Sequence, residues 1–230
     1  MYQDIKERVY QANLDLVEHG LVVFTFGNVS EIDRKAGVVA IKPSGVSYDD
    51  MRPDQIVILD LKGHAIDGDL RPSSDTPTHL ELYRQFKNIG GITHTHSCHA
   101  TMWAQACKDI PCFGTTHADH FYGSIPVTDV MTQEDIQDHY ELNTGKVIVK
   151  RFENLDPKAT PAVLVANHGP FTWGQTPAAA VESGIVLEKV AKIAMGTMQI
   201  NPSVKPIEDH LLEKHYSRKH GCGAYYGQRE

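Results

Sequence analysis

The chain has 230 residues, with 22 Lys or Arg against 29 Asp or Glu, which gives a formal charge of −7 at pH 7. This acidic balance argues against a general nucleic-acid binder. No apolar run reaches the roughly 20 residues that a membrane-spanning helix needs. The amphipathic start is unlike a signal sequence, and the four cysteines form no Cys-x-x-Cys pair. These features predict one soluble domain, residues 1–230, with reduced thiols and a cytoplasmic location.

Helical and strand-like segments alternate along the chain. An apolar stripe closed by Gly20 predicts a first helix over 2–19. The segments that follow, in chain order, are expected to be strands at 21–26, 37–42 and 56–61, a helix at 77–87, a strand around His94, a helix at 98–107, strands at 125–127, 146–150 and 162–166, and helices at 177–199 and 207–220. No linker or repeat divides them. The pattern predicts one α/β domain with a mixed sheet between helices.

Two histidines, His94 and His96, stand two residues apart in Thr93-His-Thr-His-Ser97. In an extended segment alternate side chains share a face, and neutral imidazole is a favoured zinc ligand. Asp75 and His168, each beside a strand end or a glycine turn, would complete four ligands for zinc or a similar divalent metal. The alternatives are ordinary ones. The chain has 13 histidines, and Asp75, followed by Thr-Pro, suits a helix cap.

Three short turns have a composition suited to phosphate. They are Gly27-Asn28-Val29-Ser30, Lys42-Pro43-Ser44-Gly45 and Pro72-Ser73-Ser74. Glycine lets backbone amides approach an anion, hydroxyls can donate, and a lysine adds charge. Each could be an ordinary turn, but three of them near a candidate metal site favour a small phosphorylated metabolite.

Two other polar stretches could transfer protons. Thr115-Thr-His-Ala-Asp119 offers Asp119 as a general acid or base, and the basic tail Lys214–Gly221 is followed by Tyr225 and Tyr226. The alternative to a catalytic role for the tail is that it forms a solvated helix face and a frayed terminus. No Walker A or Rossmann motif is present. The residues alone indicate a metal-dependent enzyme that acts on a small phosphate ester.

Taken together, the motifs resemble the class II aldolase family, and within it the L-ribulose-5-phosphate 4-epimerases. The resemblance runs in order from about residue 2 to 228, through the segments Thr25–Ser30, Ile41–Val46, Pro72–His79, Thr93–Ser97, Gly114–Asp119, Asn167–Pro170 and Lys214–Gly227. It implies a single three-layer domain with a largely antiparallel central sheet. It also implies a homotetramer with sites at subunit interfaces, in which the tail, residues 207–230, completes a neighbour's site.

The resemblance also implies a role for each candidate residue. The metal ligands would be Asp75, His94, His96 and His168, with zinc as the expected ion and manganese or cobalt as substitutes. The phosphate of a ketopentose substrate would be held by Gly27, Asn28, Lys42, Ser44, Gly45, Ser73 and Ser74. The proton-transfer pair would be Asp119 and Tyr226, with His215 and Glu141 in supporting roles.

Inversion of carbon 4 of L-ribulose 5-phosphate to give D-xylulose 5-phosphate explains this set of groups. The carbon-4 proton is not next to a carbonyl, so simple deprotonation cannot invert it. Breaking the bond between carbons 3 and 4 gives an enediolate, which a zinc ion would stabilise as a Lewis acid, and glycolaldehyde phosphate, which the phosphate turns would retain while it rotates. Re-forming the bond then needs proton transfer on both faces of the aldehyde.

Two other functions remain open at this point. A class II aldolase of the fuculose- or rhamnulose-1-phosphate type would use the same cleavage but release its aldehyde. The relatives of that type carry a glutamate where Asp75 stands. A non-catalytic interaction module of the same fold, as in cytoskeletal proteins, would not need the ligands and proton-transfer groups that this sequence retains. The sequence does not distinguish breakdown of L-arabinose from that of L-ascorbate.

Overall fold

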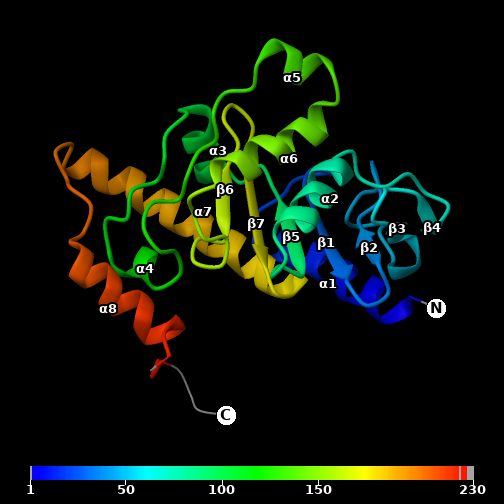
Figure 1. The fold of residues 1–230 in the computed structure, drawn as a ribbon, viewed down its shortest axis with the longest axis horizontal. Coiled ribbons are helices and arrows are strands. Elements are labelled where there is room, and N and C mark those ends of the chain that lie inside the picture. The colour runs from blue at the N-terminus through cyan, green and yellow to red at the C-terminus, as the bar shows by residue number, and fades with distance from the viewer. Residues whose placement is uncertain (1, 223, 227–230) are drawn as a thin grey trace.

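A computed structural model describes residues 2–222 and 224–226, with a seven-stranded sheet through the centre of the protein (Figure 1). The strands are β1 (Asn28–Asp33), β2 (Val38–Ile41), β3 (Val57–Asp60), β4 (Ala65–Asp67), β5 (Gly91–His94), β6 (Ala162–Leu164) and β7 (Pro170–Gly174). They lie in the order β4-β3-β2-β1-β5-β7-β6. All neighbouring strands pair antiparallel. The antiparallel sheet agrees with the expected mixed, largely antiparallel sheet, except that no parallel pair occurs among the named strands.

Helices cover both faces of the sheet and make three layers (Figure 1). Helices α1 (Gln3–Glu18) and α7 (Pro177–Ile200) pack on one face, and α2 (Thr76–Gln85) and α6 (Tyr140–Arg151) on the other. Successive side chains of a strand point to opposite faces, and β2 follows this rule. Val39 joins the core under α2 and α6, whereas Val38 and Ala40 pack with α1. The remaining helices are η1 (Pro53–Gln55), α3 (Cys98–Gln105), α4 (Thr115–Ala118), α5 (Gln133–Gln137) and α8 (Asp209–His220).

The predicted strand over 21–26 does not form. Phe24 has a φ of 54°, a left-handed conformation that interrupts an extended strand. Its side chain is 81% exposed, and Val23 and Phe26 beside it are also exposed. The strand begins instead at Asn28, because Asn28 and Ser30 pair with β5 as Asn28↔His94 and Ser30↔Ile92. The apolar run is thus a surface loop next to the strand.

The predicted strand over 146–150 is also wrong, because these residues lie in α6. Val147, Ile148 and Val149 suggest a strand by their β-branching. The buried positions Thr144 and Ile148 are spaced by four, however, which is the helical period. The segment 125–127 makes isolated bridges to Ile110 and Leu164 rather than a strand. Strands β1, β4 and β7 were not expected, whereas the predicted helices at 2–19, 77–87, 98–107, 177–199 and 207–220 are confirmed within two residues at each end.

A buried histidine, His117, holds the loop that follows α4. Its Nε2 donates to the carbonyl of Gly123 at 2.8 Å, and burial lowers its pKa to about 4. In the unfolded chain this histidine takes up a proton below its ordinary pKa of about 6.5, but the folded chain does not until about pH 4. The unfolded state therefore binds more protons between these values, and the stability from this residue is lost as the pH falls through this window.

We expect the substitution His117→Gln to flatten the pH dependence of stability. A pKa of about 4 implies that His117 contributes about 2 kcal/mol to the fall in unfolding free energy between pH 7 and pH 5. Urea unfolding of both proteins at the two pH values measures the difference. His19→Gln, at the exposed end of α1, is the matched control and should keep the wild-type dependence. An equal fall in wild type and His117→Gln would contradict the prediction.

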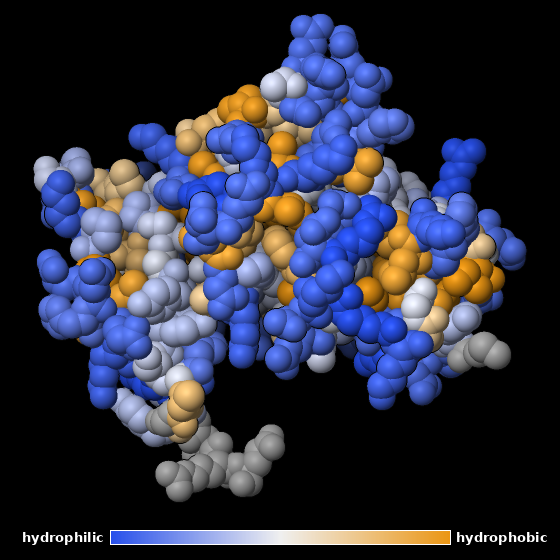
Figure 2. Space-filling view, in the orientation of Figure 1, coloured by the Kyte–Doolittle hydropathy of each residue, from blue (hydrophilic) through white to orange (hydrophobic). Residues whose placement is uncertain are grey.

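The described helices include none that is long and apolar enough to cross a membrane. Figure 2 shows mainly hydrophilic residues over the face seen in Figure 1, with apolar residues gathered in smaller patches between them. The four cysteines are free rather than paired in disulfides.

Candidate metal and phosphate site

Three histidines converge where β5 ends and β6 turns into β7. His94 ends β5, His96 follows two residues later, and His168 lies in the turn between β6 and β7. Each offers a ring nitrogen that lies within 4.8 Å of the other two. β5 pairs with β7, with His94 opposite Phe171, so the sheet itself brings the two segments together. His96 lies two residues beyond the end of β5, and its ring still converges with that of His94.

The hydrogen bonds and burial of these rings suit metal binding. Nδ1 of His94 lies 2.9 Å from the carbonyl oxygen of Pro170. A carbonyl only accepts, so Nδ1 carries the hydrogen and Nε2 is left as the free electron-pair donor. Burial lowers the pKa of His168 to about 4, and burial followed by the nearby His94 lowers that of His96. All these effects favour neutral imidazole, the form that binds metal.

Asp75 lies in the same cavity as the histidines. It precedes α2 but makes no side-chain capping hydrogen bond. Its carboxylate instead accepts from Nδ2 of Asn28 at 2.7 Å. Burial opposes its ionisation, but the neighbouring His94 and His79 and the Asn28 bond outweigh burial and lower its pKa. The group whose nitrogen atoms converge within 4.8 Å consists of the histidines alone, so Asp75 as the fourth ligand stays a prediction.

A cavity of about 590 Å³ joins the histidines to the three predicted phosphate turns. Its walls include every residue predicted for phosphate: Gly27, Asn28, Lys42, Ser44, Gly45, Ser73 and Ser74. Two of the turns are joined by a bridge between Pro43 and Pro72. Gly27 has a φ of 76°, and a Cβ there would lie 2.9 Å from the carbonyl oxygen of His94. Only glycine lets this turn approach the metal ligands so closely.

Lys42 is a buried cation on the wall of this cavity. Its Nζ donates to the carbonyl of Val46 at 2.9 Å and lies 4.8 Å from the centre of the Tyr48 ring. Within residues 2–222 and 224–226 no carboxylate forms a salt bridge with it. Burial lowers its pKa to about 8, because a charged group loses its hydration there. A bound anion would supply the missing negative charge.

Two residues at the start of α6, Tyr140 and Glu141, also line the cavity. The hydroxyl of Tyr140 lies 3.2 Å from Nδ1 of His168, and the two rings stack with centroids 6.1 Å apart. Burial raises the pKa of Tyr140. Glu141 is among the residues predicted from the sequence, whereas Tyr140 is not. An aromatic residue on a helix usually belongs to the core, so the residue type alone did not indicate a role for Tyr140. The only sequence signal was its position directly before Glu141.

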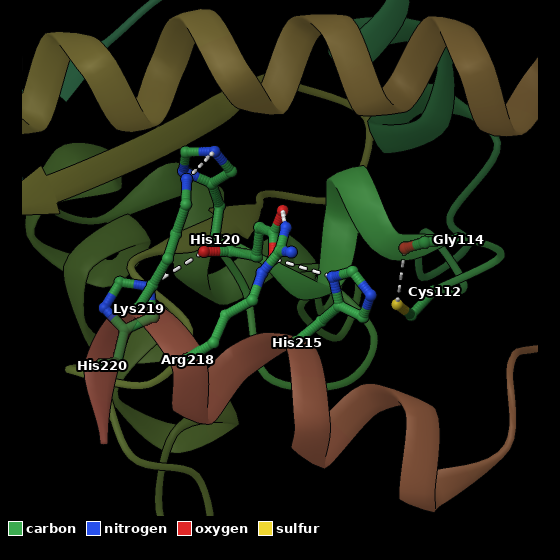
Figure 3. A network of polar contacts seen from close by, with 8 residues as sticks. Cys112, Gly114, His120, His215, Arg218, Lys219 and His220 are labelled. Atoms are coloured by element: carbon green, nitrogen blue, oxygen red, sulfur yellow. Dashed lines mark hydrogen bonds and ion pairs between the residues drawn. The ribbon is translucent and has the colours of Figure 1, made fainter. Parts of the chain in front are cut away.

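Asp119 and His215 come together, but outside this cavity. Asp119 ends α4 and accepts from Nδ1 of His215 at 3.0 Å and from Nε of Arg218 at 2.9 Å. Figure 3 shows His215, Arg218 and His220 reaching from α8 to the α4 loop. Burial opposes ionisation of Asp119, but hydrogen bonds from Arg218 and His215 outweigh it and lower its pKa. The carboxylate is thus ionised and held firmly by α8.

Tyr226 belongs to the same group of residues. The guanidinium of Arg218 lies 4.7 Å from the centre of its ring, and Nζ of Lys219 lies 4.8 Å from it. The side chain is exposed. Figure 1 places α4 and α8 at the lower left, apart from β1 and β2, which carry the phosphate turns. Within one chain, therefore, Asp119, His215 and Tyr226 form one cluster and the metal and phosphate residues form another. Residues 227–230 of the tail lie outside the described part.

Known proteins resemble this chain over most or all of its length. A family model described as "Class II Aldolase and Adducin N-terminal domain" matches residues 7–195. Two curated relatives, from Salmonella paratyphi C (strain RKS4594) and Salmonella choleraesuis (strain SC-B67), are each 52% identical over 227 residues, or 99% of this chain and 100% of the relative. Both bear the name "L-ribulose-5-phosphate 4-epimerase UlaF".

Solved structures share the fold. An L-fuculose 1-phosphate aldolase superposes with a TM-score of 0.77 at 27% identity, covering 94% of this chain and 95% of that one. An L-fuculose-1-phosphate aldolase from Thermus thermophilus superposes with a TM-score of 0.68 at 21% identity, covering 88% of this chain and 100% of that one. The second likeness concerns the fold alone. Because the family model spans most of the chain and the curated relatives match it from end to end, the chain belongs to the class II aldolase and adducin family.

Proposed function

We propose that this protein is a metal-dependent L-ribulose-5-phosphate 4-epimerase that interconverts L-ribulose 5-phosphate and D-xylulose 5-phosphate. The observation that carries the proposal is the single cavity in which three convergent histidines adjoin three phosphate-type turns. The curated relatives with the epimerase name match the whole chain, the tail included. A sugar phosphate is the substrate that this cavity and these relatives support together.

The donor set suits a divalent metal of the zinc type. Three neutral imidazoles and the Asp75 carboxylate are borderline ligands, which zinc accepts and which manganese or cobalt can also use. The hydrogen bond from His94 to Pro170 orients its ring for such a role. A divalent metal held here supplies Lewis-acid stabilisation for the negative charge that appears when a carbon–carbon bond of the substrate breaks.

The other cavity residues would control the phosphate end of the substrate. Lys42, with no carboxylate partner among the described residues, would neutralise part of the phosphate charge. Ser44, Ser73 and Ser74 would donate hydroxyl hydrogens, and the Gly45 turn would present backbone amides. Together they would retain the aldehyde fragment while it rotates. That retention is what separates an epimerase from an aldolase, since an aldolase releases the fragment.

Proton transfer calls for an acid and a base on the two faces of the aldehyde, and the predicted pair does not line the cavity of its own chain. We propose that Asp119 and Tyr226 of a neighbouring subunit are these groups, with His215 orienting Asp119 and Glu141 contributing from the cavity wall. The enzyme would then be a homotetramer whose sites lie between subunits, with the tail, residues 207–230, completing each site. The exposed loop with Val23, Phe24 and Phe26 beside the cavity offers an apolar surface for that contact. We place the enzyme in the cytoplasm.

The direct test follows conversion of L-ribulose 5-phosphate to D-xylulose 5-phosphate with a coupled assay, with and without a chelator. Metal-dependent conversion to an equilibrium mixture is the expected result. Free glycolaldehyde phosphate as the main product would instead favour the aldolase. Failure to bind one equivalent of metal per chain would favour a non-catalytic member of the family.

We expect Lys42→Met to weaken substrate binding more than turnover. The methionine keeps the unbranched apolar part of the side chain but removes the charged ammonium group proposed to face the phosphate. Loss of one charge-assisted hydrogen bond of about 1.5–3 kcal/mol predicts a KM higher by about 10- to 100-fold. Steady-state kinetics and competition by inorganic phosphate would measure it. Lys62→Met, at an exposed turn, is the control. An unchanged KM and an unchanged phosphate inhibition constant would remove Lys42 from the phosphate site.

A further inference from the structure

The hydrogen bond between Tyr140 and His168 has a direction that chemistry dictates. Tyr140 lies 3.2 Å from Nδ1 of His168. A histidine that gives Nε2 to a metal carries its hydrogen on Nδ1. Nδ1 of His168 must then donate, and the oxygen of Tyr140 must accept. The hydroxyl hydrogen of Tyr140 is not used by this bond. It can be donated to a group bound in the cavity, because Tyr140 lines the cavity wall.

The sheet order fixes which part of the cavity Tyr140 occupies. The turn with Lys42 follows β2 and the turn with Asn28 opens β1, whereas His94 ends β5 and His168 joins β6 to β7. Since the strands run in the order β2-β1-β5-β7, the phosphate turns lie on one side of the cavity and the histidines on the other. Tyr140 stacks on His168, which belongs to the β6–β7 turn. It therefore lies at the end of the cavity away from the phosphate turns.

A ketopentose 5-phosphate that spans this cavity presents known groups at each position. Its phosphate, on carbon 5, would lie at the phosphate turns, and its carbonyl and carbon-3 oxygens would lie toward the histidines. The carbon-1 hydroxymethyl group is then the part that extends past the histidines, on the side of Tyr140. Its oxygen accepts the kind of hydrogen bond that a free phenol hydrogen gives.

We propose that Tyr140 binds the carbon-1 hydroxyl of the ketose phosphate and thereby selects substrates that carry a hydroxymethyl ketone. The assignment rests on the proposed epimerase function and adds a residue to it. Tyr140 accepts from His168 and donates to the substrate, so it couples substrate recognition to the orientation of a metal ligand. Tyr140 acts in the chain that holds the histidines, unlike the proton-transfer groups proposed for the neighbouring subunit.

The test compares two substrates and two proteins. D-Xylulose 5-phosphate and 1-deoxy-D-xylulose 5-phosphate differ only at carbon 1, and epimerisation of each at carbon 4 is followed by NMR. Wild type should prefer the hydroxylated substrate by about 10-fold in kcat/KM, the upper range for one neutral hydrogen bond. Tyr140→Phe should lose about 10-fold on that substrate and almost nothing on the deoxy compound. The ratio of kcat/KM for the two substrates should therefore fall to near 1 in Tyr140→Phe. Such non-additivity is expected when the two altered groups are in contact.

A purely structural role for Tyr140 would lower activity on both substrates alike, and that result would overturn the assignment. So would a Tyr140→Phe enzyme that keeps the 10-fold preference. The metal content of each protein is measured at saturating metal. Equal metal content shows that a change in substrate preference does not come from loss of metal. Tyr10→Phe, on α1 and outside the cavity walls, is the matched control and should keep the preference. If wild type epimerises neither compound, the proposed function itself fails.

Discussion

Replacing His96 by asparagine should lower turnover by on the order of 10³-fold and release the metal. His96 is one of the three convergent ligands and is exposed, so its loss should leave the fold intact. A metal contributes several kcal/mol of charge stabilisation in the transition state, and each 1.36 kcal/mol is tenfold in rate. Metal content after dialysis and kcat at saturating substrate measure the two effects.

His19→Asn is the control for this experiment, because His19 is exposed beyond the end of α1 and does not line the cavity. It should bind metal and turn over as wild type does. A His96→Asn protein that retains one equivalent of metal, with turnover within about tenfold of wild type, would show that His96 is not a ligand. Thermal unfolding of both variants checks that the fold is retained.

Tyr226→Phe should lower turnover by about 10²-fold, the usual scale for loss of an acid or base, while metal content stays unchanged. The phenylalanine keeps the ring that packs against Arg218 and Lys219 and removes only the hydroxyl. The metal should be unaffected because Tyr226 is not one of the three convergent histidine ligands. Tyr225→Phe, one residue away and equally exposed, is the matched control. Near-normal turnover of Tyr226→Phe would remove Tyr226 from the mechanism.

Mixing two inactive variants separates a shared site from a site within one chain. Tyr226→Phe chains carry intact histidines and His96→Asn chains carry an intact tyrosine. If sites form between subunits, co-expression should restore activity to about a quarter of wild type, because half of the cavities are intact and half of those face an intact tail. A site within one chain would give no recovery. The mixture therefore tests the subunit arrangement without a structure of the oligomer.

Local sequence patterns predicted five of the helices, α1, α2, α3, α7 and α8, and part of the sheet. The stripes behind α1 and α7 are long enough for the helical period to be clear. The wrong secondary-structure predictions lie where tertiary contacts or a turn of the backbone override the preference of the residue types. The apolar run 21–26 became a loop because Phe24 turns the chain, and 146–150 became helix because α2 covers α6. The polar segment β1 is a strand because it pairs with β2 on one side and β5 on the other. These pairings join distant parts of the chain, so no local sequence pattern predicts them.

The candidate site was easier to predict than the fold. Its residues are of types that carry chemistry, so His94, His96, His168 and the phosphate residues could be named and were found around one cavity. Other features depend on distant contacts. The separation of Asp119 from the cavity and the position of Tyr140 against His168 could be seen only in the folded chain. Spacing along the sequence contains no information on either contact.

The proposed division of the site between the cavity and the tail would have an evolutionary consequence. The cavity lies within residues 7–195, which the family model matches, whereas α8 and Tyr226 lie beyond them. Mutations in the tail can accumulate without disturbing the ligands or the core that supports them. A lineage can thus retain one bond-breaking centre and diverge in what happens to the fragments. Chimeras that exchange residues 207–230 between family members would retrace that divergence in the laboratory.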